Sequence, residues 1–251
     1  MTALSIRDLR VRFGAFTAVG GVSFDAADDE VHFLIGPNGA GKTTCVDAIT
    51  GLVRGSGSVT MGGTELLGRS VQATARRGVG RTFQTASVFE QLTVVQNLDI
   101  AAGLHRRWPA LLGMRRSVEP RVEQALRDTG LTELQDAAAG TLSHGQKQWL
   151  EIGMLLVQDA QALMLDEPVA GMSHDERVAT GELLHRVKRG RAVVVVEHDM
   201  EFMRTFASRV TVLHQGQVLS QGSVTEVQED PRVQEVYLGT AAQPEEELVH
   251  A

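Results

Sequence analysis

A glycine-rich stretch near the N-terminus has the residue types and spacing of a phosphate-binding loop. Gly36 to Thr43 reads GPNGAGKT, which fits the pattern GxxxxGK[ST]. It follows an apolar run, Val31 to Ile35, that is typical of a short strand, and it precedes Lys42 to Leu52, which has helical periodicity with Val46, Ile49 and Leu52 on one face. Glycine turns before helices are common, but this strand, loop and helix order favours a site for nucleotide phosphates.

Each part of the loop has a chemical reason. Glycines allow successive backbone N–H groups to point at phosphate oxygens, and the positive end of the following helix attracts anions. Lys42 supplies a positive charge for the β and γ phosphates, and the hydroxyl of Thr43 is a ligand for Mg²⁺. We therefore expect nucleotide contacts from Gly36, Pro37, Asn38, Gly39, Ala40, Gly41, Lys42, Thr43 and Thr44.

Two adjacent carboxylates follow a second apolar run. Ala162 to Leu165 precedes Asp166 and Glu167, and open α/β sheets bind ligands at the carboxyl ends of their strands. Because neighbouring side chains of a strand point to opposite faces, we expect Asp166 to face Mg²⁺ and Glu167 to act as general base on the attacking water. Taken alone, the acidic pair is explained as well by a polar start to a loop; together with the phosphate loop it favours catalysis.

A third motif, Leu142-Ser143-His144-Gly145-Gln146, precedes the Asp-Glu strand. At this point the sequence resembles the ATP-binding subunit of ABC transporters, whose hallmark is an LSGGQ signature, and the resemblance extends over about residues 4–240. Ser143 is placed to cap the following helix, where its hydroxyl and the backbone of Gly145 offer donors to an anion. The resemblance implies that Ser143, Gly145 and Gln146 contact the nucleotide.

The resemblance also assigns residues outside these three motifs. Phe13 matches the aromatic residue that stacks on adenine, Gln84 matches the glutamine that reaches Mg²⁺, and His198 matches the histidine that contacts the γ phosphate. Without the resemblance, Phe13 is nearly as well explained as a core aromatic residue on a strand. The implied catalytic residues are Glu167, His198, Lys42 and Gln84, and the implied metal ligands are Thr43, Gln84 and Asp166.

Two positions depart from the family pattern. His144 stands where the signature has its first glycine, so that a side chain crowds the approach of a phosphate to this helix end. Ser173 stands where the loop after the catalytic carboxylates usually carries an aspartate. We expect contact geometry at the signature to change, and communication across a dimer to be weaker or differently connected at Ser173.

The fold implied is α/β, a P-loop NTPase (RecA-like) core with a small antiparallel β subdomain and an inserted α-helical subdomain. The core and its N-terminal β subdomain comprise residues 1–86 and 159–251, the helical signature subdomain comprises residues 87–158, and residues 241–251 form a disordered acidic tail. Two apolar runs, Ala162 to Leu165 and Ala192 to Val196, bracket an expected helix from Ser173 to Arg189, which is typical of a parallel βαβ unit.

Shorter elements complete this prediction. A strand is expected from Leu4 to Val11, a hairpin between Gly51 and Gly68, and a second hairpin about Gln215-Gly216. Helical periodicity from about Ser87 onward includes Val94, Leu98 and Ile100, and Pro231 suits the first turn of a final helix.

Composition restricts the classes of protein. The chain has 251 residues, of which 43% are hydrophobic and 22% charged, and its formal net charge is −7. Its apolar runs are far shorter than the roughly 18–20 residues that cross a bilayer, and the charged N-terminus does not resemble a secretory signal, so we expect a cytoplasmic protein. The single cysteine, Cys45, agrees with a reducing compartment and is expected to be buried. The negative charge disfavours nucleic acid as a partner.

Within the family, Leu142 to Leu156 and Asp166 to Met172 are most similar to branched-chain amino acid uptake systems and, more narrowly, to their urea or short-chain amide relatives. The function implied is the motor subunit of an importer that uses ATP and Mg²⁺, with urea or short-chain amides as the narrower expectation for the solute. Branched-chain amino acid import is the alternative; a soluble ABC ATPase outside transport, a different P-loop enzyme and a scaffold are less favoured.

The implied partners follow from the same resemblance. Two ATP-binding subunits, identical or paralogous, would pack head to tail around two ATP molecules. They would lie on the inner face of the membrane against integral permease subunits, with contact expected near Gln84 to Gln96, and would act indirectly with a solute-binding protein.

Overall fold

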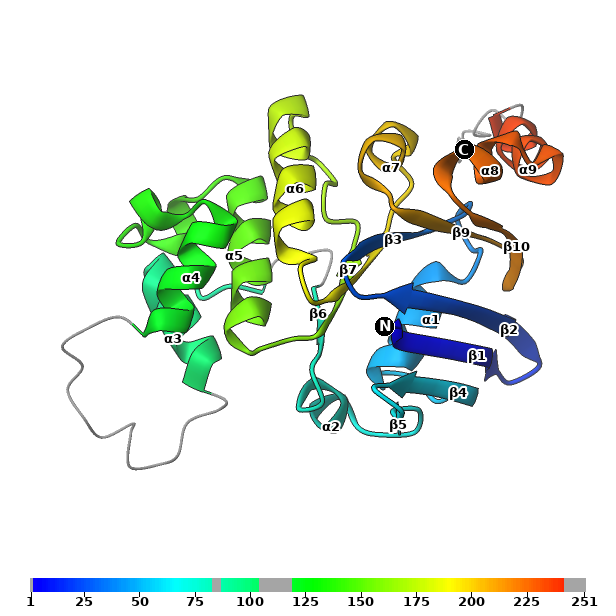
Figure 1. The fold of residues 1–251 in the computed structure, drawn as a ribbon, viewed down its shortest axis with the longest axis horizontal. Coiled ribbons are helices and arrows are strands. Elements are labelled where there is room, and N and C mark those ends of the chain that lie inside the picture. Colours follow the sequence, from blue (N-terminus) through cyan, green and yellow to red (C-terminus); the bar gives the residue numbers. More distant parts are fainter. Residues whose placement is uncertain (1, 83–86, 104–118, 242–251) are drawn as a thin grey trace, which may run out of the picture.

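The computed structural model describes residues 2–82, 87–103 and 119–241 (Figure 1). Two sheets with helices on either side make up this part of the chain. Residues 242–251, which include most of the expected acidic tail, lie outside the described residues.

The larger sheet has the strand order β10-β9-β3-β8-β7-β6. β3 pairs in parallel with β8 and β9, and β7 pairs in parallel with β8 and β6, whereas β10 is antiparallel to β9. The carboxyl ends of β3, β8, β7 and β6 therefore meet at one edge. The strand bounds are β3 (Glu30–Ile35), β6 (Val79–Arg81), β7 (Ala162–Asp166), β8 (Ala192–Val196), β9 (Arg209–His214) and β10 (Gln217–Gly222).

The central strands are short apolar runs because both of their faces are covered. All residues of β7 and β8 are buried, as the runs of alanine, leucine and valine predict for a parallel sheet. Alternate residues enter two different cores: Val193 and Val195 pack with the helices of the signature side, and Val194 and Val196 pack with α1 and the smaller sheet. The predicted parallel βαβ unit is confirmed.

The smaller sheet is antiparallel and is built from the N-terminal strands. Its order is β2-β1-β4-β5, which confirms the expected N-terminal strands and the hairpin after Gly51. β2 continues through Gly20-Gly21. The bounds are β1 (Thr2–Phe13), β2 (Phe16–Ala27), β4 (Ser56–Met61) and β5 (Thr64–Glu65).

The helices fall into groups around the larger sheet. Helices α3, α4 and α5 contact one another beside β6 and β7, on the side away from α8 and α9 (Figure 1). The helix bounds are α1 (Lys42–Thr50), α2 (Val71–Ala75), α3 (Val94–Ala102), α4 (Pro120–Thr129), η3 (Thr132–Leu134), η4 (Ala139–Thr141), α5 (His144–Val157), α6 (His174–Val187), α7 (Met200–Phe206), α8 (Val224–Glu229) and α9 (Pro231–Ala241).

Two apolar residues that periodicity assigned to helix faces are not in the core. Leu52 lies beyond α1, which ends at Thr50 and is capped by Gly51 in a left-handed conformation with φ 83°, and Leu52 is 47% exposed. Ile100 is within α3 but is 49% exposed. Helical spacing identifies a shared face only as far as the helix continues and the neighbouring element covers it.

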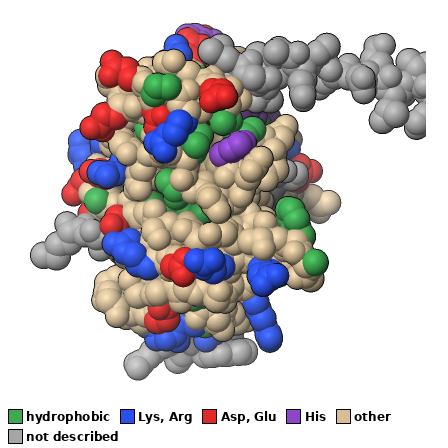
Figure 2. All heavy atoms as spheres, turned by 90° about the vertical axis from the view of Figure 1, so that its right-hand side faces the viewer, with side chains coloured by type: hydrophobic (Ala, Val, Ile, Leu, Met, Phe, Trp, Pro, Cys, Tyr) green, Lys and Arg blue, Asp and Glu red, His purple; other side chains and the backbone are tan. Residues whose placement is uncertain are grey.

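Surface charges are mixed on the face nearest the C-terminal helices. Figure 2 shows Lys and Arg side chains interspersed with Asp and Glu among the described residues of this face. A mixed-sign surface generates no strong attraction for a polyanion. Among the residues that the structure describes, no helix has both the length and the apolar character that crossing a bilayer requires.

A buried arginine connects three elements of the core. Arg81, the last residue of β6, pairs through Nη1 with Oδ1 of Asp47 on α1, and its Nη2 lies 3.2 Å from Oδ2 of Asp166 at the end of β7. The side chains of Arg81 and Asp166 are only 9% and 4% exposed. Arg81 therefore compensates the negative charge of a buried carboxylate and fixes the strand that leads toward Gln84.

Replacing Arg81 with alanine should lower the free energy of unfolding by about 3–5 kcal/mol, because it leaves buried negative charge without its counterion. Urea unfolding followed by circular dichroism measures the change. Arg127→Ala is the matched control, because Arg127 pairs with Glu123 at 3.9 Å on the surface of α4 and should contribute about 0.5 kcal/mol or less. Equal losses in the two variants would contradict the assignment of a buried pair.

Cys45 lies in α1 and is completely buried, as expected. Burial raises the pKa of its thiol to about 12, so the thiol is both protonated and inaccessible at neutral pH. A chromogenic disulfide reagent should modify the native protein, with or without ATP, about a hundredfold more slowly than the protein in concentrated urea. A Thr225→Cys, Cys45→Ala variant, with its thiol at an exposed position, should react as a free thiol does; fast labelling of native Cys45 would show that α1 is not packed as described.

Candidate active site

The phosphate loop connects the end of β3 to the first turn of α1. Gly36 and Gly41 have φ of +153° and +97°, and a Cβ atom at these positions would lie 2.2 Å from the carbonyl oxygen of Leu213 and 2.6 Å from that of Ala18, respectively. Only glycine fits such contacts and dihedrals. Because no side chain caps α1 at Gly41, the first backbone N–H groups of this helix remain available to a phosphate.

Lys42 lies across its own loop. Its Nζ donates to the carbonyl oxygens of Gly36 at 2.7 Å and Pro37 at 3.1 Å, and the residue is buried. Burial lowers the pKa of Lys42, and the carboxylates of Glu167, Asp166 and Glu197 partly offset this. An ammonium group that contacts carbonyl oxygens and lies near three carboxylates is positively charged and can exchange the carbonyl contacts for contacts with phosphate oxygens.

Asp166 and Glu167 reach the same sheet edge by different backbone routes. Asp166 is the last residue of β7, and burial raises the pKa of its carboxyl group despite the opposing effect of Arg81. Glu167 lies beyond the strand with φ 49°, and its N–H donates to Val196 at 2.9 Å. Because Glu167 lies beyond the strand in a left-handed conformation, strand alternation does not by itself set the direction of its side chain.

His198 follows β8 and lies near two carboxylates. Its Nδ1 is 3.7 Å from Oε1 of Glu167 and 3.8 Å from Oε2 of Glu197. The imidazole is 65% exposed, whereas Glu197 is 1% exposed. The parallel register of β7 and β8 thus brings together Glu167 and His198, which the sequence separates by a whole βαβ unit.

Glu197 binds backbone N–H groups of the loops that follow β7 and β8. Its Oε2 accepts the N–H groups of His198 at 2.9 Å and Asp199 at 3.2 Å, and its Oε1 accepts that of Val169 at 3.4 Å. Burial raises the pKa of Glu197, and these donors oppose the shift. Asp199 in turn caps α7 and pairs with Arg177 of α6 at 2.7 Å. The loops after β7 and β8 are therefore held together by carboxylates.

The signature motif forms the N-terminus of α5, as predicted. The hydroxyl of Ser143 accepts the N–H of Gln146 at 3.2 Å, and Oε1 of Gln146 accepts the N–H of Ser143 at 3.0 Å, which is a capping box. The same hydroxyl donates to Oε1 of Glu176 on α6 at 2.8 Å. Gly145 is buried against that carboxylate, whereas His144 is exposed.

Two residues assigned by resemblance remain to be placed. Phe13 ends β1 and is 53% exposed, opposite the 66% exposed Phe16 in the adjoining hairpin, so it is not a core aromatic residue. Gln84 lies outside the described residues.

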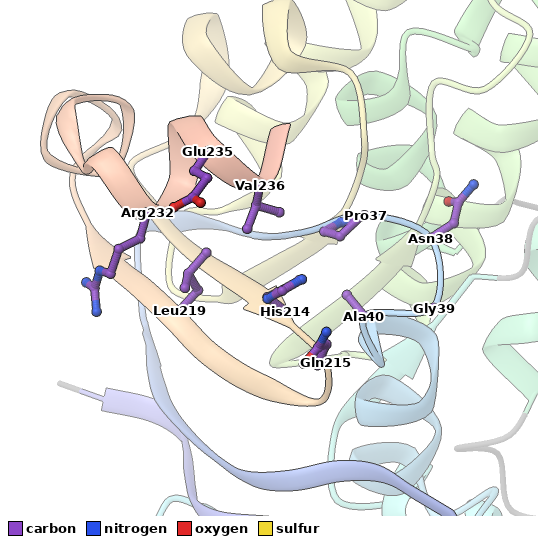
Figure 3. A pocket seen from close by; sticks show the side chains of 10 residues that line it. All are labelled: Pro37, Asn38, Gly39, Ala40, His214, Gln215, Leu219, Arg232, Glu235 and Val236. Atoms are coloured by element: carbon purple, nitrogen blue, oxygen red, sulfur yellow. The ribbon is translucent and has the colours of Figure 1, made fainter. Parts of the chain in front are cut away.

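An open groove of about 770 Å³ lies beside the phosphate loop (Figure 3). One wall is the loop itself, and the others come from the turn after β9, from β10 and from α9. In Figure 3 Asn38 points away from α9, whereas Val236 points from α9 toward the groove. Sequence analysis did not anticipate that the C-terminal helix borders the loop. The lining residues are Pro37, Asn38, Gly39, Ala40, His214, Gln215, Leu219, Arg232, Glu235 and Val236.

The oxygen donors at the sheet edge fit a magnesium ion. Oδ1 of Asp166 is buried without a hydrogen-bond partner among the described residues. Thr43, an exposed residue at the start of α1, provides a hydroxyl group. The described residues contain no cluster of three or more His, Cys, Asp or Glu side chains suited to a metal. A carboxylate and a hydroxyl are hard oxygen donors, which suit Mg²⁺, an ion that takes most of its ligands from phosphates and water.

Sequence reasoning missed three charged residues of this region. Arg81 lies three positions before Gln84, and Glu197 directly precedes His198, but nothing in their spacing showed that they are buried. Glu176 was detectable, because Ser173 and Glu176 fit the pattern of a capping box. Its second contact, with Ser143, joins residues 33 positions apart, so no local sequence pattern could have predicted it.

Comparison with known proteins agrees with this geometry. The ABC transporter family model matches residues 19–170, and a model described as branched-chain amino acid ATP-binding cassette transporter matches residues 217–243. The chain is 35% identical to the high-affinity branched-chain amino acid transport ATP-binding protein BraF of Pseudomonas aeruginosa, over 95% of this chain and 98% of that protein. It is 33% identical to the corresponding protein LivG of Escherichia coli, with the same coverage.

Solved structures share the fold. An ATP-binding cassette of an ABC transporter in its ADP conformation superposes with a TM-score of 0.82 at 28% identity, over 95% of this chain and 99% of that one. A nucleotide-free cassette superposes with a TM-score of 0.81 at 26% identity, over 94% and 99%. The expected α/β fold with a P-loop NTPase core is confirmed. This chain belongs to the ATP-binding subunits of ABC transporters, which are ATPases, and within them to the branched-chain amino acid transport family.

Proposed function

We propose that this protein is the ATP-hydrolysing motor of an importer for branched-chain amino acids. The observation that carries the motor function is the meeting of Lys42, Asp166, Glu167 and His198 at one sheet edge. The solute rests on other grounds, because the motor does not touch it: the relatives reported above are named for branched-chain amino acids, and residues 217–243 match that family outside the motor motifs. These comparisons favour amino acids over urea or short-chain amides.

The chain's own residues have separable roles in hydrolysis. Phe13, exposed at the end of β1, stacks on the adenine, and the N–H groups at the start of α1 hold the phosphates. Lys42 exchanges its carbonyl contacts for the β and γ phosphates. Glu167 accepts a proton from the water that attacks the γ phosphorus, and His198, 3.7 Å from that carboxylate, orients the phosphoryl group. Thr43, Asp166 and Gln84 would hold Mg²⁺, which offsets negative charge on the phosphates when it is bound.

The signature completes the site only from a second copy. Helix α5, which Ser143 caps, lies across β6 and β7 from α1 (Figure 1). A head-to-tail pair, in which Ser143 of each copy faces the phosphate loop of the other, gives both motifs a ligand. A monomeric P-loop enzyme would leave the signature without a role.

The ATPase rate against protein concentration tests this function. The rate should rise more than linearly, because the active unit is a dimer, and Glu167→Gln should lower turnover by about a hundredfold or more by removing the general base. That variant should also accumulate as an ATP-bound dimer in size-exclusion chromatography. A rate proportional to concentration and insensitive to Glu167 would assign the protein to monomeric P-loop enzymes.

The permease is expected to dock in a second groove, of about 250 Å³, between α2 and α5. Leu52 and Val71 on its wall are 47% and 41% exposed, and Arg81 and Ser87, on either side of Gln84, also line it. Apolar side chains of this size beside the segment that leads to the catalytic edge suit a helix of a membrane subunit. The groove overlaps the expected segment, Gln84 to Gln96, only at Ser87 among the described residues.

Leu52→Asp and Val71→Asp should each lower ATP-dependent solute uptake into vesicles by about tenfold or more, because docking would bury an unpaired carboxylate. The ATPase rate of the isolated subunit should remain within about twofold, since neither Leu52 nor Val71 is among the residues assigned to the nucleotide or to Mg²⁺. Val178→Asp, at a 38% exposed position of α6, is the matched control and should leave uptake unchanged. Parallel loss of uptake and soluble ATPase in the groove variants would reject this docking site.

A further inference from the structure

Glu176 places a negative charge against the signature. The residue lies in the first turn of α6, and its Oε1 accepts the hydroxyl of Ser143 at 2.8 Å. Its Oε2 accepts both the N–H and the hydroxyl of Ser173, at 3.1 and 2.9 Å. A Cβ atom added to Gly145 would lie 3.0 Å from Oε1. One carboxylate therefore bridges the N-termini of α5 and α6.

This contact uses the only proton that the Ser143 hydroxyl can donate. The oxygen of that hydroxyl already accepts the N–H of Gln146 at 3.2 Å, and its proton goes to Glu176. The hydrogen bond from Ser143 also lowers the pKa of Glu176, so the carboxylate is ionised at neutral pH. In this arrangement an arriving phosphate meets a negative charge and a hydroxyl that has no proton to offer.

We propose that Glu176 competes with the γ phosphate for the Ser143 hydroxyl and thereby sets the ATP concentration at which two copies close on each other. The proposal rests on the head-to-tail dimer of the proposed function. In the separate subunit Glu176 satisfies Ser143 and the positive end of α5. When ATP on the partner copy arrives, the Oε1 contact breaks and Ser143 turns to the phosphate.

The geometry allows this exchange without unfolding either helix. Oε2 of Glu176 still caps α6 through Ser173 after Oε1 has left Ser143. Ser143 still caps α5, because its hydroxyl oxygen accepts from Gln146 whichever way the proton points. Only one hydrogen bond changes partner, and the exposed surface around it gives the released carboxylate room and water.

Glu176→Gln tests the competition for Ser143. Glutamine suits the same capping box as glutamate: its amide oxygen keeps accepting from Ser173 while its NH2 group faces Ser143, so the cap of α6 is kept and the negative charge and the acceptor for the Ser143 proton are removed. Glu182→Gln makes the same charge change at an exposed position of α6 and is the matched control. Both are combined with Glu167→Gln to stop turnover, and dimer formation is followed by analytical ultracentrifugation across a titration with MgATP.

We expect Glu176→Gln to lower the ATP concentration for half-maximal dimer formation by about threefold or more, the size of one like-charge contact at a solvated surface, and Glu182→Gln to leave it unchanged. An unchanged or higher ATP concentration for half-maximal dimer formation in Glu176→Gln would overturn the proposal and show that Glu176 only holds Ser143 in position. If the Glu167→Gln parent itself forms no dimer with ATP, the head-to-tail motor fails first and this proposal falls with it.

Discussion

The structure depends on placing many ionisable groups at the carboxyl edge of a buried parallel sheet. Charge at such an edge is costly unless each group has a partner, and the described residues supply these partners in a definite pattern. Arg81 lies between Asp47 and Asp166, and Lys42 lies among backbone carbonyls with carboxylates close by. Within the described part of the chain, Asp166 keeps one oxygen without a protein partner. The charges of this edge are compensated in the protein alone, and the remaining oxygen of Asp166 and the ammonium group of Lys42 can still bind a divalent cation and a phosphate.

Carboxylates also connect the catalytic edge to the signature. Glu197 binds the backbone of the loops that carry His198 and Val169. The loop after β7 then runs to Ser173, where Glu176 caps α6 and reaches Ser143 of α5. Hydrogen bonds and a short length of chain therefore join the proposed place of hydrolysis to the signature motif, which meets the other copy in the proposed dimer. Such continuity is a physical route for coupling between the two.

Ser173 illustrates how a departure from a family pattern is accommodated. A serine in place of the usual aspartate is still a good N-cap, and in this structure it forms a full capping box with Glu176. His144 is similarly accommodated, because its side chain is exposed and the caps of α5 come from its neighbours Ser143 and Gln146. Both replacements preserve the helix ends and change only the charge and volume that these positions present at the surface.

Local patterns were enough to predict the elements and much of the candidate site. GPNGAGKT between an apolar run and a helix, an Asp-Glu pair after buried residues, and Ser-x-x-Gln before α5 each specify a structure through nearby chemistry, because glycine dihedrals, strand burial and helix caps involve only a few neighbouring residues. Such patterns also identified the family. They did not identify the solute, because the motor does not contact it.

The tertiary structure alone decided which distant charges meet. The pairing of Arg81 with Asp166, of Glu197 with three backbone donors and of Glu176 with Ser143 depends on the parallel register of β6, β7 and β8 and on the packing of α5 against α6. The left-handed backbone of Glu167 and the exposure of Leu52 also depend on where a strand or helix ends within the fold. A single sequence carries periodicity and caps, but the cost of burying a charge is set by whatever the folded chain places beside it.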